Sequence, residues 1–330
     1  MQYIQKWDVK VENKIKVAVV TGAAGFVGSN LVDDLLRRGT SVIGIDNLST
    51  GRIKFLHKAM KNTNFTFLEK DLFIDDNFEE IFKDSDAIFH LAANADVRFG
   101  PEHPMKDFEQ NTFVTQKMLE ATRVAGVKKF VFSSTGSVYG ESEVIPTPEN
   151  APFPIQTSLY GASKLACEGL ITSYAEAFGI QVWIFRLVSI LGPRYTHGHV
   201  FDFYKQLTNH PEYLDVLGNG NQRKSYLHIL DCVDAINQAL ENTKKHVNIF
   251  NIGSNDTCEV RDSIRWISDE MQLDPIIKFG IENRGWIGDN PLIHLSTEKV
   301  QNLGWKSKYT IKESIKETVK FMKSNSWIFD

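Results

Sequence analysis

The sequence is that of a mid-sized globular protein with little net charge. It has 330 residues, of which 42% are hydrophobic and 24% are charged, and its formal net charge is −4. A chain of this length can bury a sizeable core in one large domain or two joined domains. The nearly balanced charge gives no reason to expect nucleic acid or an anionic membrane as a partner. No run of about 18 apolar residues predicts a membrane span.

The chain begins with a polar segment, residues 1–13, which lacks the apolar stretch of a signal peptide. We expect this segment to be a short surface extension. The three cysteines, Cys167, Cys232 and Cys258, form neither a CxxC pair nor a Cys/His metal pattern. They are predicted to be reduced thiols in or near the core, with no metal site, which favours a cytoplasmic location.

From residue 14 onward, apolar runs alternate with amphipathic helical stretches. The runs that predict buried strands lie at residues 15–21, 41–45, 65–70, 87–92, 129–133 and 181–187. Helices are predicted at 26–38 and, as two long segments that each stop at a glycine, at 107–125 and 159–178. Strands separated by helices pair in parallel through right-handed crossovers. The expected fold class is therefore α/β, a doubly wound parallel sheet with helices on both faces.

After residue 187 the pattern is less regular. Glycines, prolines and aromatic residues crowd 192–226, and the predicted elements beyond them are helices at 231–242, 259–271 and 312–323 and a strand at 248–252. We expect a first domain of residues 14–187, to which 229–253 returns, and a smaller α/β domain of residues 188–228 and 254–330. A ligand would lie in the cleft between the two domains.

A glycine-rich turn follows the first predicted strand. Gly22, Gly25 and Gly28 form the pattern G-x-x-G-x-x-G between that strand and the next helix. The first glycine permits a tight turn, the second lets the backbone approach a pyrophosphate, and the third lets the helix pack close to the strand. The helix N-terminus then faces the negative charge. The pattern predicts a dinucleotide site in a Rossmann-type fold.

Two aspartates at strand ends add to this prediction. Asp46 closes the second strand, where a carboxylate can accept hydrogen bonds from both hydroxyls of an adenosine ribose and would repel a 2′-phosphate. Asp46 therefore favours NAD over NADP, although the nearby Arg52 weakens this preference. Asp71 follows the third strand, where it would meet the adenine edge. A helix cap for Asp46 and a simple turn for Asp71 are the alternatives.

The candidate chemical centre is Tyr160 with Lys164 and Thr135. Tyr160 and Lys164 are four residues apart in a predicted helix and so share a face. A phenol with an ordinary pKa of about 10 is a poor base at neutral pH, but a nearby ammonium favours the phenolate. Tyr160 can then take a proton from a substrate hydroxyl as hydride leaves the same carbon. Thr135 would hold the reacting oxygen, although turn chemistry is an alternative for this Ser/Thr cluster.

Together these motifs resemble the extended short-chain dehydrogenase/reductases, and among them the NAD-dependent nucleotide-sugar epimerase/dehydratase family. The resemblance runs from about residue 14 to 305. The matching pieces are the glycine loop at 21–28, Asp46-Asn47, Asp71-Leu72, His90 to Ala93, Asn111, Ser133 to Thr135, Tyr160 to Lys164 and Arg186.

The resemblance implies NAD as the cofactor and places a set of residues around it. This set is Gly22, Gly25, Phe26, Val27, Asp46, Asn47, Thr50, Gly51, Asp71, Leu72, Leu91, Ala92, Ala93, Asn111, Ser133, Tyr160, Lys164 and Leu187. In the family, the lysine of the Tyr-Lys pair also binds the nicotinamide ribose, which implies the same for Lys164.

The resemblance also implies a nucleotide-diphosphate sugar lying across the cleft. The residues it assigns to this substrate are Asn94, Thr135, Ser137, Tyr160, Ser189, His199, Val200, Arg223, Lys224, Arg284 and Asp289. Ser189 stands where many members have asparagine. Lys224 stands where many have arginine, and lysine keeps the charge for a diphosphate but loses the bidentate fork. Whether Arg223 or Lys224 binds the diphosphate stays open.

The residues after Thr135 bear on the reaction. Family members first oxidise the sugar at C4, and a 4,6-dehydratase then uses an Asp-Glu pair that directly follows the threonine. Gly136 and Ser137 stand here instead. A 4-epimerase needs no further acid or base, and the segments 192–199 and 222–228 also resemble archaeal-type nucleotide-sugar 4-epimerases. The resemblance therefore implies such an epimerase, with UDP-glucose and UDP-galactose as the leading pair.

Other functions remain open at this point. They are a nucleotide-sugar 4-ketoreductase or dehydrogenase, an epimerase of UDP-glucuronate or of a GDP- or CDP-sugar, and a non-catalytic NAD-binding protein. The family's equivalents of the two long helices pair with those of a second subunit in a four-helix bundle. The resemblance thus implies a homodimer, the alternative being that both helices only cover the sheet.

Overall fold

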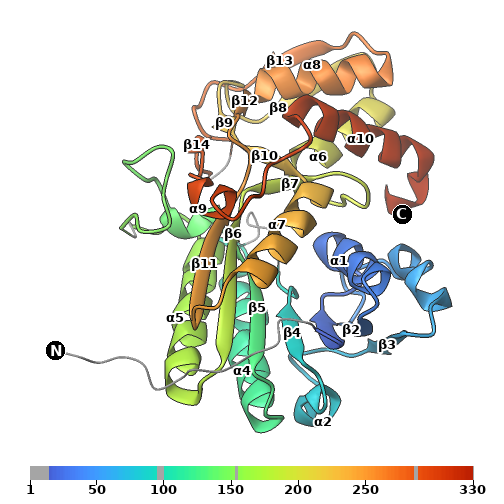
Figure 1. The fold of residues 1–330 in the computed structure, drawn as a ribbon. Coiled ribbons are helices and arrows are strands. Elements are labelled where there is room, and N and C mark those ends of the chain that lie inside the picture. The colour runs from blue at the N-terminus through green and yellow to red at the C-terminus, as the bar shows by residue number, and fades with distance from the viewer. Residues whose placement is uncertain (1–14, 95–99, 153–154, 286–288, 330) are drawn as a thin grey trace.

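The computed structural model describes residues 15–94, 100–152, 155–285 and 289–329. The predicted N-terminal extension, residues 1–13, lies outside these ranges. The chain forms a large sheet covered by helices and a second, smaller group of helices and short strands above it (Figure 1).

The large sheet has seven strands, all paired in parallel, in the order β11-β6-β5-β4-β1-β2-β3. Their bounds are β1 Val17–Thr21, β2 Ser41–Asp46, β3 Phe65–Glu69, β4 Ala87–His90, β5 Lys129–Thr135, β6 Gln181–Leu187 and β11 Val247–Ile252. The strand order reverses direction at β1, which has β4 on one side and β2 on the other. The predicted doubly wound α/β fold is confirmed, and this reversal is where such sheets bind ligands.

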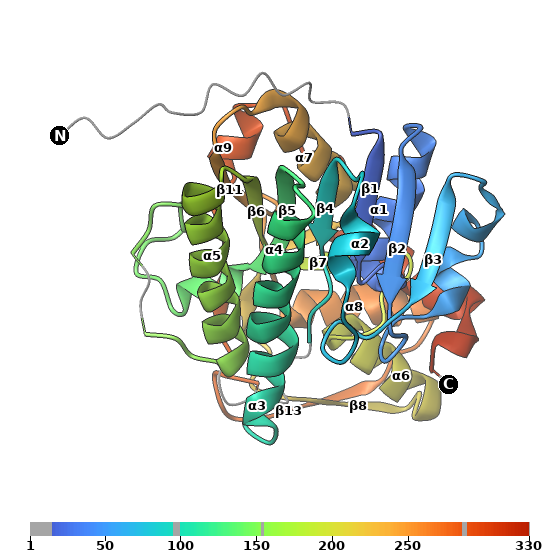
Figure 2. The ribbon, with the colours of Figure 1, turned by 90° about the horizontal axis from the view of Figure 1, so that it is seen from below.

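Helices cover both faces of the sheet because its strands are apolar on both sides. In β1, Ala18 and Val20 pack into one core cluster together with Leu31 of α1, whereas Val19 packs into another with Met118 and Ile171. The first face carries α1 (Phe26–Arg37) and α7 (Ile229–Asn242), and the second carries α2 (Phe78–Phe82), α4 (Val114–Val124) and α5 (Leu159–Phe178). Figure 2 shows α4 and α5 side by side in front of the sheet.

The prediction of one regular helix over 107–125 is wrong in its first part. The helical run begins at α3 (Pro104–Asp107), passes through a π-helical segment at Phe108–Phe113, and only then continues as α4. The wider π turn lets Asn111 face the protein interior, where its side chain donates to Ser163 Oγ at 2.9 Å and accepts from the backbone N–H of Asn94 at 2.8 Å. Such turns occur often at functional sites.

The second part of the chain is built from short elements. It contains β7 Ser189–Leu191, α6 His199–Asn209, β8 Tyr213–Val216, β9 Arg223–Lys224, β10 Tyr226–His228, β12 Cys258–Glu259, α8 Val260–Met271, β13 Ile276–Phe279, β14 Leu292–Ile293, α9 Glu298–Gln301 and α10 Ile311–Ser324. The sequence pattern missed α6 and the short strands, because two- to four-residue strands carry too little periodicity to detect.

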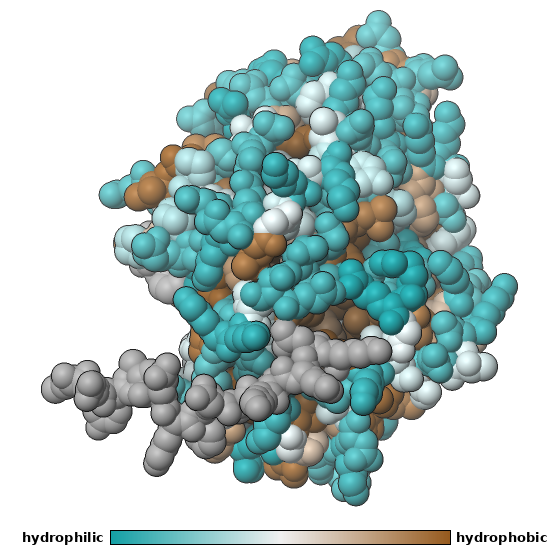
Figure 3. All heavy atoms as spheres, viewed as in Figure 1, coloured by the Kyte–Doolittle hydropathy of each residue, from teal (hydrophilic) through white to brown (hydrophobic). Residues whose placement is uncertain are grey.

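The outer surface and the cysteines can be described directly. Figure 3 shows a mostly hydrophilic outer face in this view. Cys167, Cys232 and Cys258 are buried free thiols. Within the part of the chain that the structure describes, no helix is both long enough and apolar enough to span a bilayer.

The glycine turn between β1 and α1 is closed too tightly for a side chain. A Cβ on Gly28 would lie 2.0 Å from the carbonyl oxygen of Gly22. Gly22 itself has a φ of +69°, and a Cβ there would lie 2.8 Å from the backbone nitrogen of Ala92. The contact at Gly28 holds the N-terminus of α1 against the strand end, as the sequence pattern predicts.

We expect Gly28→Ala to lower the free energy of unfolding by about 1–3 kcal/mol, because the added methyl meets backbone that cannot rotate away. Urea denaturation measures this. The matched control is Gly169→Ala in α5, where a Cβ meets nothing within 4 Å, and where the better helix propensity of alanine should stabilise by about 1 kcal/mol. Equal stability of the Gly28 variant and the parent chain would contradict the tight contact.

Candidate functional site

A cavity of about 920 Å³ opens between the carboxyl end of the large sheet and the second part of the chain. This volume is at the upper end of the range for ligand sites, roughly 300–1,000 Å³. Its walls are the glycine turn, the ends of β2, β3, β5 and β6, the first turn of α5 and residues of the second part. The site therefore has the position and size for an extended ligand.

Asp46 joins the glycine turn to the loop after β2. One carboxylate oxygen accepts from the backbone N–H of Ala24 at 2.9 Å and the other from that of Leu48 at 2.8 Å. Burial raises the pKa of Asp46, and these two hydrogen bonds oppose the rise. A Cβ on Gly51 would lie 2.6 Å from the same carboxylate. Asp46 thus shapes the cavity wall at the place where the sequence predicts a ribose.

Asp71 is held by the loop that follows β3. Its carboxylate accepts from Asn47 Nδ2 at 2.8 Å and from the backbone N–H of Phe73 at 2.8 Å. Although burial alone would raise the pKa of Asp71, hydrogen bonds from Asn47, Phe73 and Ile74 lower it overall. Asn47 and Asp71 therefore form one linked polar edge of the cavity.

The predicted chemical centre is assembled from β5 and α5. Thr135 is the last residue of β5, whereas Tyr160 and Lys164 occupy the first two turns of α5. Ser158 caps this helix by accepting from the backbone N–H of Gly161 at 3.0 Å. A Cβ on Gly161 would lie 2.9 Å from the carbonyl oxygen of Ser137. The absence of that side chain lets the first turn of α5 approach the strand end.

The side chains of Thr135, Tyr160 and Lys164 all line the cavity. The Thr135 hydroxyl lies close enough to the Tyr160 phenol to influence its pKa. Burial is the largest influence on the phenol and raises the pKa of Tyr160, with a further rise from the Asp107 carboxylate; the Thr135 hydroxyl acts in the opposite direction. The sequence predicts that Lys164 lowers the Tyr160 pKa. Apart from burial, the groups that shift this pKa here are Asp107, Thr135 and Cys167, so the role of Lys164 stays a prediction.

Lys164 is directed at β5 instead. Its ammonium donates to the carbonyl oxygen of Ser133 at 2.9 Å and lies 4.5 Å from the centroid of the Phe132 ring. Burial lowers the pKa of Lys164 to about 8, and the neighbouring Cys167 and Glu168 side chains oppose this shift. Lys164 is therefore still mostly protonated at neutral pH and remains able to contact a ligand in the cavity.

The far side of the cavity carries an ion pair and a neutral histidine. Lys224 Nζ lies 2.6 Å from Asp289 Oδ1, and the other Asp289 oxygen accepts from the backbone N–H of Gly285 at 3.0 Å. His199 Nε2 lies 2.7 Å from Ser263 Oγ. Burial, with a contribution from the Lys224 charge, lowers the pKa of His199 to about 3, so its ring is neutral at neutral pH.

The structure brings most of the predicted site residues to this cavity. Those that line it are Gly22, Gly25, Phe26, Val27, Asp46, Asn47, Thr50, Gly51, Asp71, Leu72, Leu91, Ala92, Ala93, Ser133, Thr135, Ser137, Tyr160, Lys164, Leu187, Ser189, His199, Lys224 and Asp289.

Five predicted residues lie elsewhere. Asn94, Asn111 and Val200 are buried behind the wall. Arg223 is exposed and donates to Thr257 Oγ1 at 3.3 Å, and Arg284 pairs with Glu141 on the surface. Of the two residues that the sequence left open, the structure therefore places Lys224, not Arg223, at the cavity.

The sequence reasoning missed several lining residues. Tyr195 and His197 lie on the loop after β7, Tyr226 begins β10, and Asn290 lies in the loop before β14. Tyr195 also packs edge-on against Phe26, with ring centroids 5.6 Å apart, and so joins the two walls. The proximity of Tyr226 to Lys224 in the sequence was a usable signal, whereas nothing local marks Asn290.

These residues fit the NAD that the sequence predicts. The glycine turn leaves the N-terminus of α1 uncovered by side chains, which suits a pyrophosphate. Asp46 and the Asn47–Asp71 edge present acceptors for the adenosine half. Ser133, Tyr160 and Lys164 lie at the other end of the same cavity.

Comparison with known proteins gives one consistent result. The family model described as the NAD dependent epimerase/dehydratase family matches residues 18–253. A candidate UDP-glucose 4-epimerase of Methanocaldococcus jannaschii is 34% identical over 321 residues, covering 93% of this chain and 99% of the relative.

Two solved structures share the fold over nearly the whole chain. A crystal structure of a UDP-galactose 4-epimerase has a TM-score of 0.84 and 35% identity, covering 94% of this chain and 100% of that one. The UDP-glucuronic acid 4-epimerase of Bacillus cereus, solved in complex with UDP-glucuronic acid and NAD, has a TM-score of 0.86 and 28% identity, covering 93% and 99%.

Proposed function

Because the chain belongs to the NAD dependent epimerase/dehydratase family, we propose that it is a nucleotide-sugar 4-epimerase whose substrates are UDP-glucose and UDP-galactose. The observation that carries the proposal is the convergence of Thr135, Tyr160 and Lys164 on a cavity that fits NAD, without an acid–base pair after Thr135. The names of the M. jannaschii relative and of the UDP-galactose 4-epimerase structure support the sugar pair.

The surroundings of Gly136 argue against elimination of water from the sugar. A Cβ on Gly136 would lie 3.3 Å from Leu295 Cδ1 and 3.6 Å from Ile293 Cγ2. The position where the dehydratase branch carries an acidic side chain is therefore bounded by aliphatic groups. Ser137, the next residue, offers only a hydroxyl, which donates hydrogen bonds but does not titrate in the useful range.

NAD would be held by the glycine turn, by Asp46 and the Asn47–Asp71 edge, and by Ser133, Tyr160 and Lys164 around the nicotinamide half. When bound, it supplies reversible hydride transfer at the sugar C4. The protein's own contribution is to bind both molecules, exclude water and move one proton.

Tyr160 is the residue that moves the proton. Its phenolate takes the proton of the C4 hydroxyl as the carbonyl forms, and the phenol returns it when C4 is reduced from the other face. Thr135 donates to or accepts from the same oxygen and keeps it near the phenol. Lys164, which is mostly protonated at neutral pH, adds a positive charge to this end of the cavity.

The second part of the chain would hold the nucleotide diphosphate. Lys224 is the lysine that faces the cavity from this part at β9, and Asp289 orients its ammonium. Ser189 and the neutral His199 add hydrogen-bonding groups beside it. This assignment favours Lys224 over Arg223 as the diphosphate contact.

A neutral hexose suits the described cavity better than a hexuronate. The side chains grouped around Thr135 and Tyr160 on the described wall, Ser133 and Ser137, are neutral hydroxyls. Lys164 already donates to the Ser133 carbonyl, and Lys224 is paired with Asp289. UDP-glucuronate is therefore the runner-up substrate, favoured by relatives such as the B. cereus epimerase.

The direct test follows C4 inversion by NMR. The purified chain with NAD should interconvert UDP-galactose and UDP-glucose with no net change in NADH absorbance, and should turn over UDP-glucuronate less efficiently. Tyr160→Phe should lower kcat by about 100- to 10,000-fold while still binding NAD. Stoichiometric NADH formation would instead establish a dehydrogenase, and no inversion with any UDP-, GDP- or CDP-sugar would reject the proposal.

The pH dependence tests the link between Thr135 and Tyr160. The Thr135 hydroxyl lowers the Tyr160 pKa, so Thr135→Val should raise it, and the phenolate would form only at higher pH. The acidic limb of the kcat/KM profile should therefore move to higher pH, with a loss of about 10- to 100-fold at neutral pH. The control is Thr172→Val, which removes a hydroxyl from α5, the helix that carries Tyr160. This variant should leave the pH profile unchanged. If the acidic limb of the Thr135→Val variant stays at the same pH as in the parent chain, Thr135 does not lower the Tyr160 pKa.

We also propose that the chain is a cytoplasmic homodimer. Phe108, Phe113, Leu159 and Phe178 are exposed on α5 and on the run that leads into α4. The two helices are joined by hydrogen bonds in which Tyr174 accepts from Gln116 and donates to Glu120. A rigid, partly apolar outer face of this kind suits packing against the same two helices of a second copy. The division into residues 14–187 with 229–253, and 188–228 with 254–330, is part of the same proposal.

A charge in that face should separate the subunits. Ala166 is exposed on α5, and Ala166→Arg would bury a guanidinium without a partner if the helices pair. Sedimentation velocity should show a dimer for the parent chain and a monomer for this variant. Met60→Arg, at an exposed apolar residue outside both helices, should remain a dimer. A parent chain that sediments as a monomer at micromolar concentration would contradict the proposal.

A further inference from the structure

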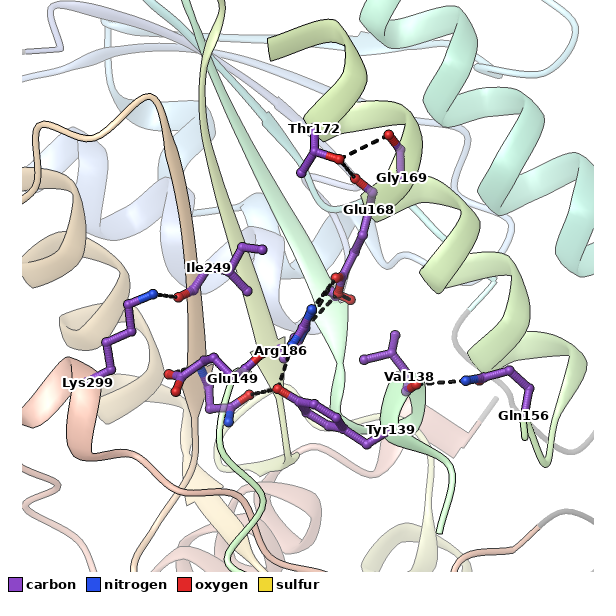
Figure 4. A network of polar contacts seen from close by, with 12 residues as sticks. Val138, Tyr139, Glu149, Gln156, Glu168, Gly169, Thr172, Arg186, Ile249 and Lys299 are labelled. Carbon is purple, nitrogen blue, oxygen red and sulfur yellow. Dashed lines mark hydrogen bonds and ion pairs between the residues drawn. The ribbon is translucent and has the colours of Figure 1, made fainter. Parts of the chain in front are cut away.

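A buried ion pair lies behind the chemical centre. Arg186 of β6 and Glu168 of α5 are joined by contacts of 2.7 Å from Nη2 to Oε2 and 3.1 Å from Nε to Oε1, and their side chains are only 2% and 5% exposed. Figure 4 shows the guanidinium between this carboxylate and the hydroxyl of Tyr139. Neither charged group lines the cavity.

Glu168 is part of a repeating pattern along α5. Tyr160, Lys164 and Glu168 follow one another at intervals of four residues, so they lie on one face of the helix. That face meets the end of β5. The Tyr160 phenol meets Thr135, the Lys164 ammonium donates to the Ser133 carbonyl at 2.9 Å, and the Glu168 carboxylate accepts from Ser134 Oγ at 2.5 Å.

Ser133 and Ser134 of β5 are thus each hydrogen-bonded to α5, and Thr135, which follows them, lies beside Tyr160. Ser134 stands directly before Thr135, and its bond to Glu168 limits how far the strand end can slide or twist against the helix. The carboxylate is itself held in two directions by the planar fork of Arg186. Arg186 also donates to the carbonyl oxygen of Glu149 at 3.0 Å, which fixes the fork.

The network extends to the segment that packs against Gly136, the residue after Thr135. Tyr139 donates to Asn251 Oδ1 at 2.8 Å, and Asn251 Nδ2 donates to the carbonyl oxygen of Thr147 at 2.9 Å. Thr147 pairs through its backbone with His294 and Ser296, on either side of Leu295. Leu295 is the side chain closest to a Cβ on Gly136. The same set of bonds therefore also fixes the packing around the residue that follows Thr135.

Stability alone does not account for this arrangement. Replacing a buried ion pair by apolar groups of similar size is often neutral or stabilising, because desolvation offsets the attraction. The ion pair instead fixes the orientation of the Glu168 carboxylate. A carboxylate held by a rigid fork can accept from Ser134 in one geometry only, and an aliphatic side chain in its place would not set that geometry.

We propose that Glu168, oriented by Arg186, is a positioning residue that holds Thr135 in register with Tyr160 through the hydroxyl of Ser134. The inference rests on the proposed function, since it concerns the two residues that act on the sugar C4 oxygen. Neither Glu168 nor Arg186 is proposed to contact a ligand. Loss of the Ser134 bond frees the end of β5, so the Thr135 hydroxyl is no longer held beside the Tyr160 phenol, while the cavity and the ion pair remain.

The test changes Ser134, because removing Glu168 would leave the Arg186 charge buried without a partner and would unfold the chain for an unrelated reason. Ser134→Ala should lower kcat by about 10- to 100-fold, the loss typical of a small misplacement of a reacting group, with KM and NAD affinity changed less than about 2-fold. The acidic limb of the kcat/KM profile should move to higher pH, as for Thr135→Val. Asp107 and Cys167 also act on the phenol, and the variant leaves both in place.

Two further variants test whether the Ser134 hydroxyl is the group that matters. Ser134→Thr keeps a hydroxyl and should recover most of kcat. Thr172→Ala removes a hydroxyl that donates to the backbone carbonyl of the same Glu168 at 2.9 Å, and it should change neither kcat nor the pH profile. Ser134→Cys, with a weaker donor of similar size, stands in for the alanine variant if that variant does not fold.

The outcomes separate this inference from the proposed function. A parent chain that epimerises no nucleotide sugar rejects the proposed function. An active parent whose Ser134→Ala variant loses stability but keeps kcat and the pH profile shows a merely structural bond and overturns the positioning role. A loss of kcat that Ser134→Thr does not recover overturns it as well, because the hydroxyl would then not be the group that matters.

Discussion

The parallel pairing of the large sheet is the constraint on which the site depends. Because all seven strands run the same way, their carboxyl ends meet at one edge. Thr21, Asp46, Thr135 and Leu187 end β1, β2, β5 and β6 at that edge, and the register pairs Thr135 directly with Leu187. A slip of one residue would turn each side chain to the opposite face, so the pairing register decides whether a site exists at all.

Buried carboxylates then fix the positions of loops and side chains around the site that backbone contacts alone would leave mobile. Asp46 fastens the glycine turn to the loop after β2 through two backbone N–H groups. Asp289 holds Lys224 and the backbone of Gly285, and Glu168 holds Ser134. Each carboxylate has its partners supplied by the protein, which offsets the cost of removing it from water.

The sequence predicted the repetitive half of the fold well and the irregular half poorly. The strands of the large sheet are continuous apolar runs, α1 is amphipathic, and α5 is a long apolar segment that stops at Gly179, so their existence follows from local pattern. The π-helical turn at Phe108–Phe113 does not, because it is selected by the buried partners of Asn111. Helix α6 was missed although its buried Val200, Phe203, Tyr204 and Leu207 recur at helical spacing, so here a usable local signal was overlooked.

By itself, the sequence determined the α/β class, the dinucleotide turn and the spacing of Tyr160 and Lys164, because each depends on residues a few positions apart. Only the tertiary structure decided which cations face the cavity, placing Lys224 there and Arg223 and Arg284 outside it. It also decided that burial raises the Tyr160 pKa, and that Glu168 reaches Ser134. Those outcomes depend on desolvation and on contacts between residues far apart in the chain, which no local spacing encodes.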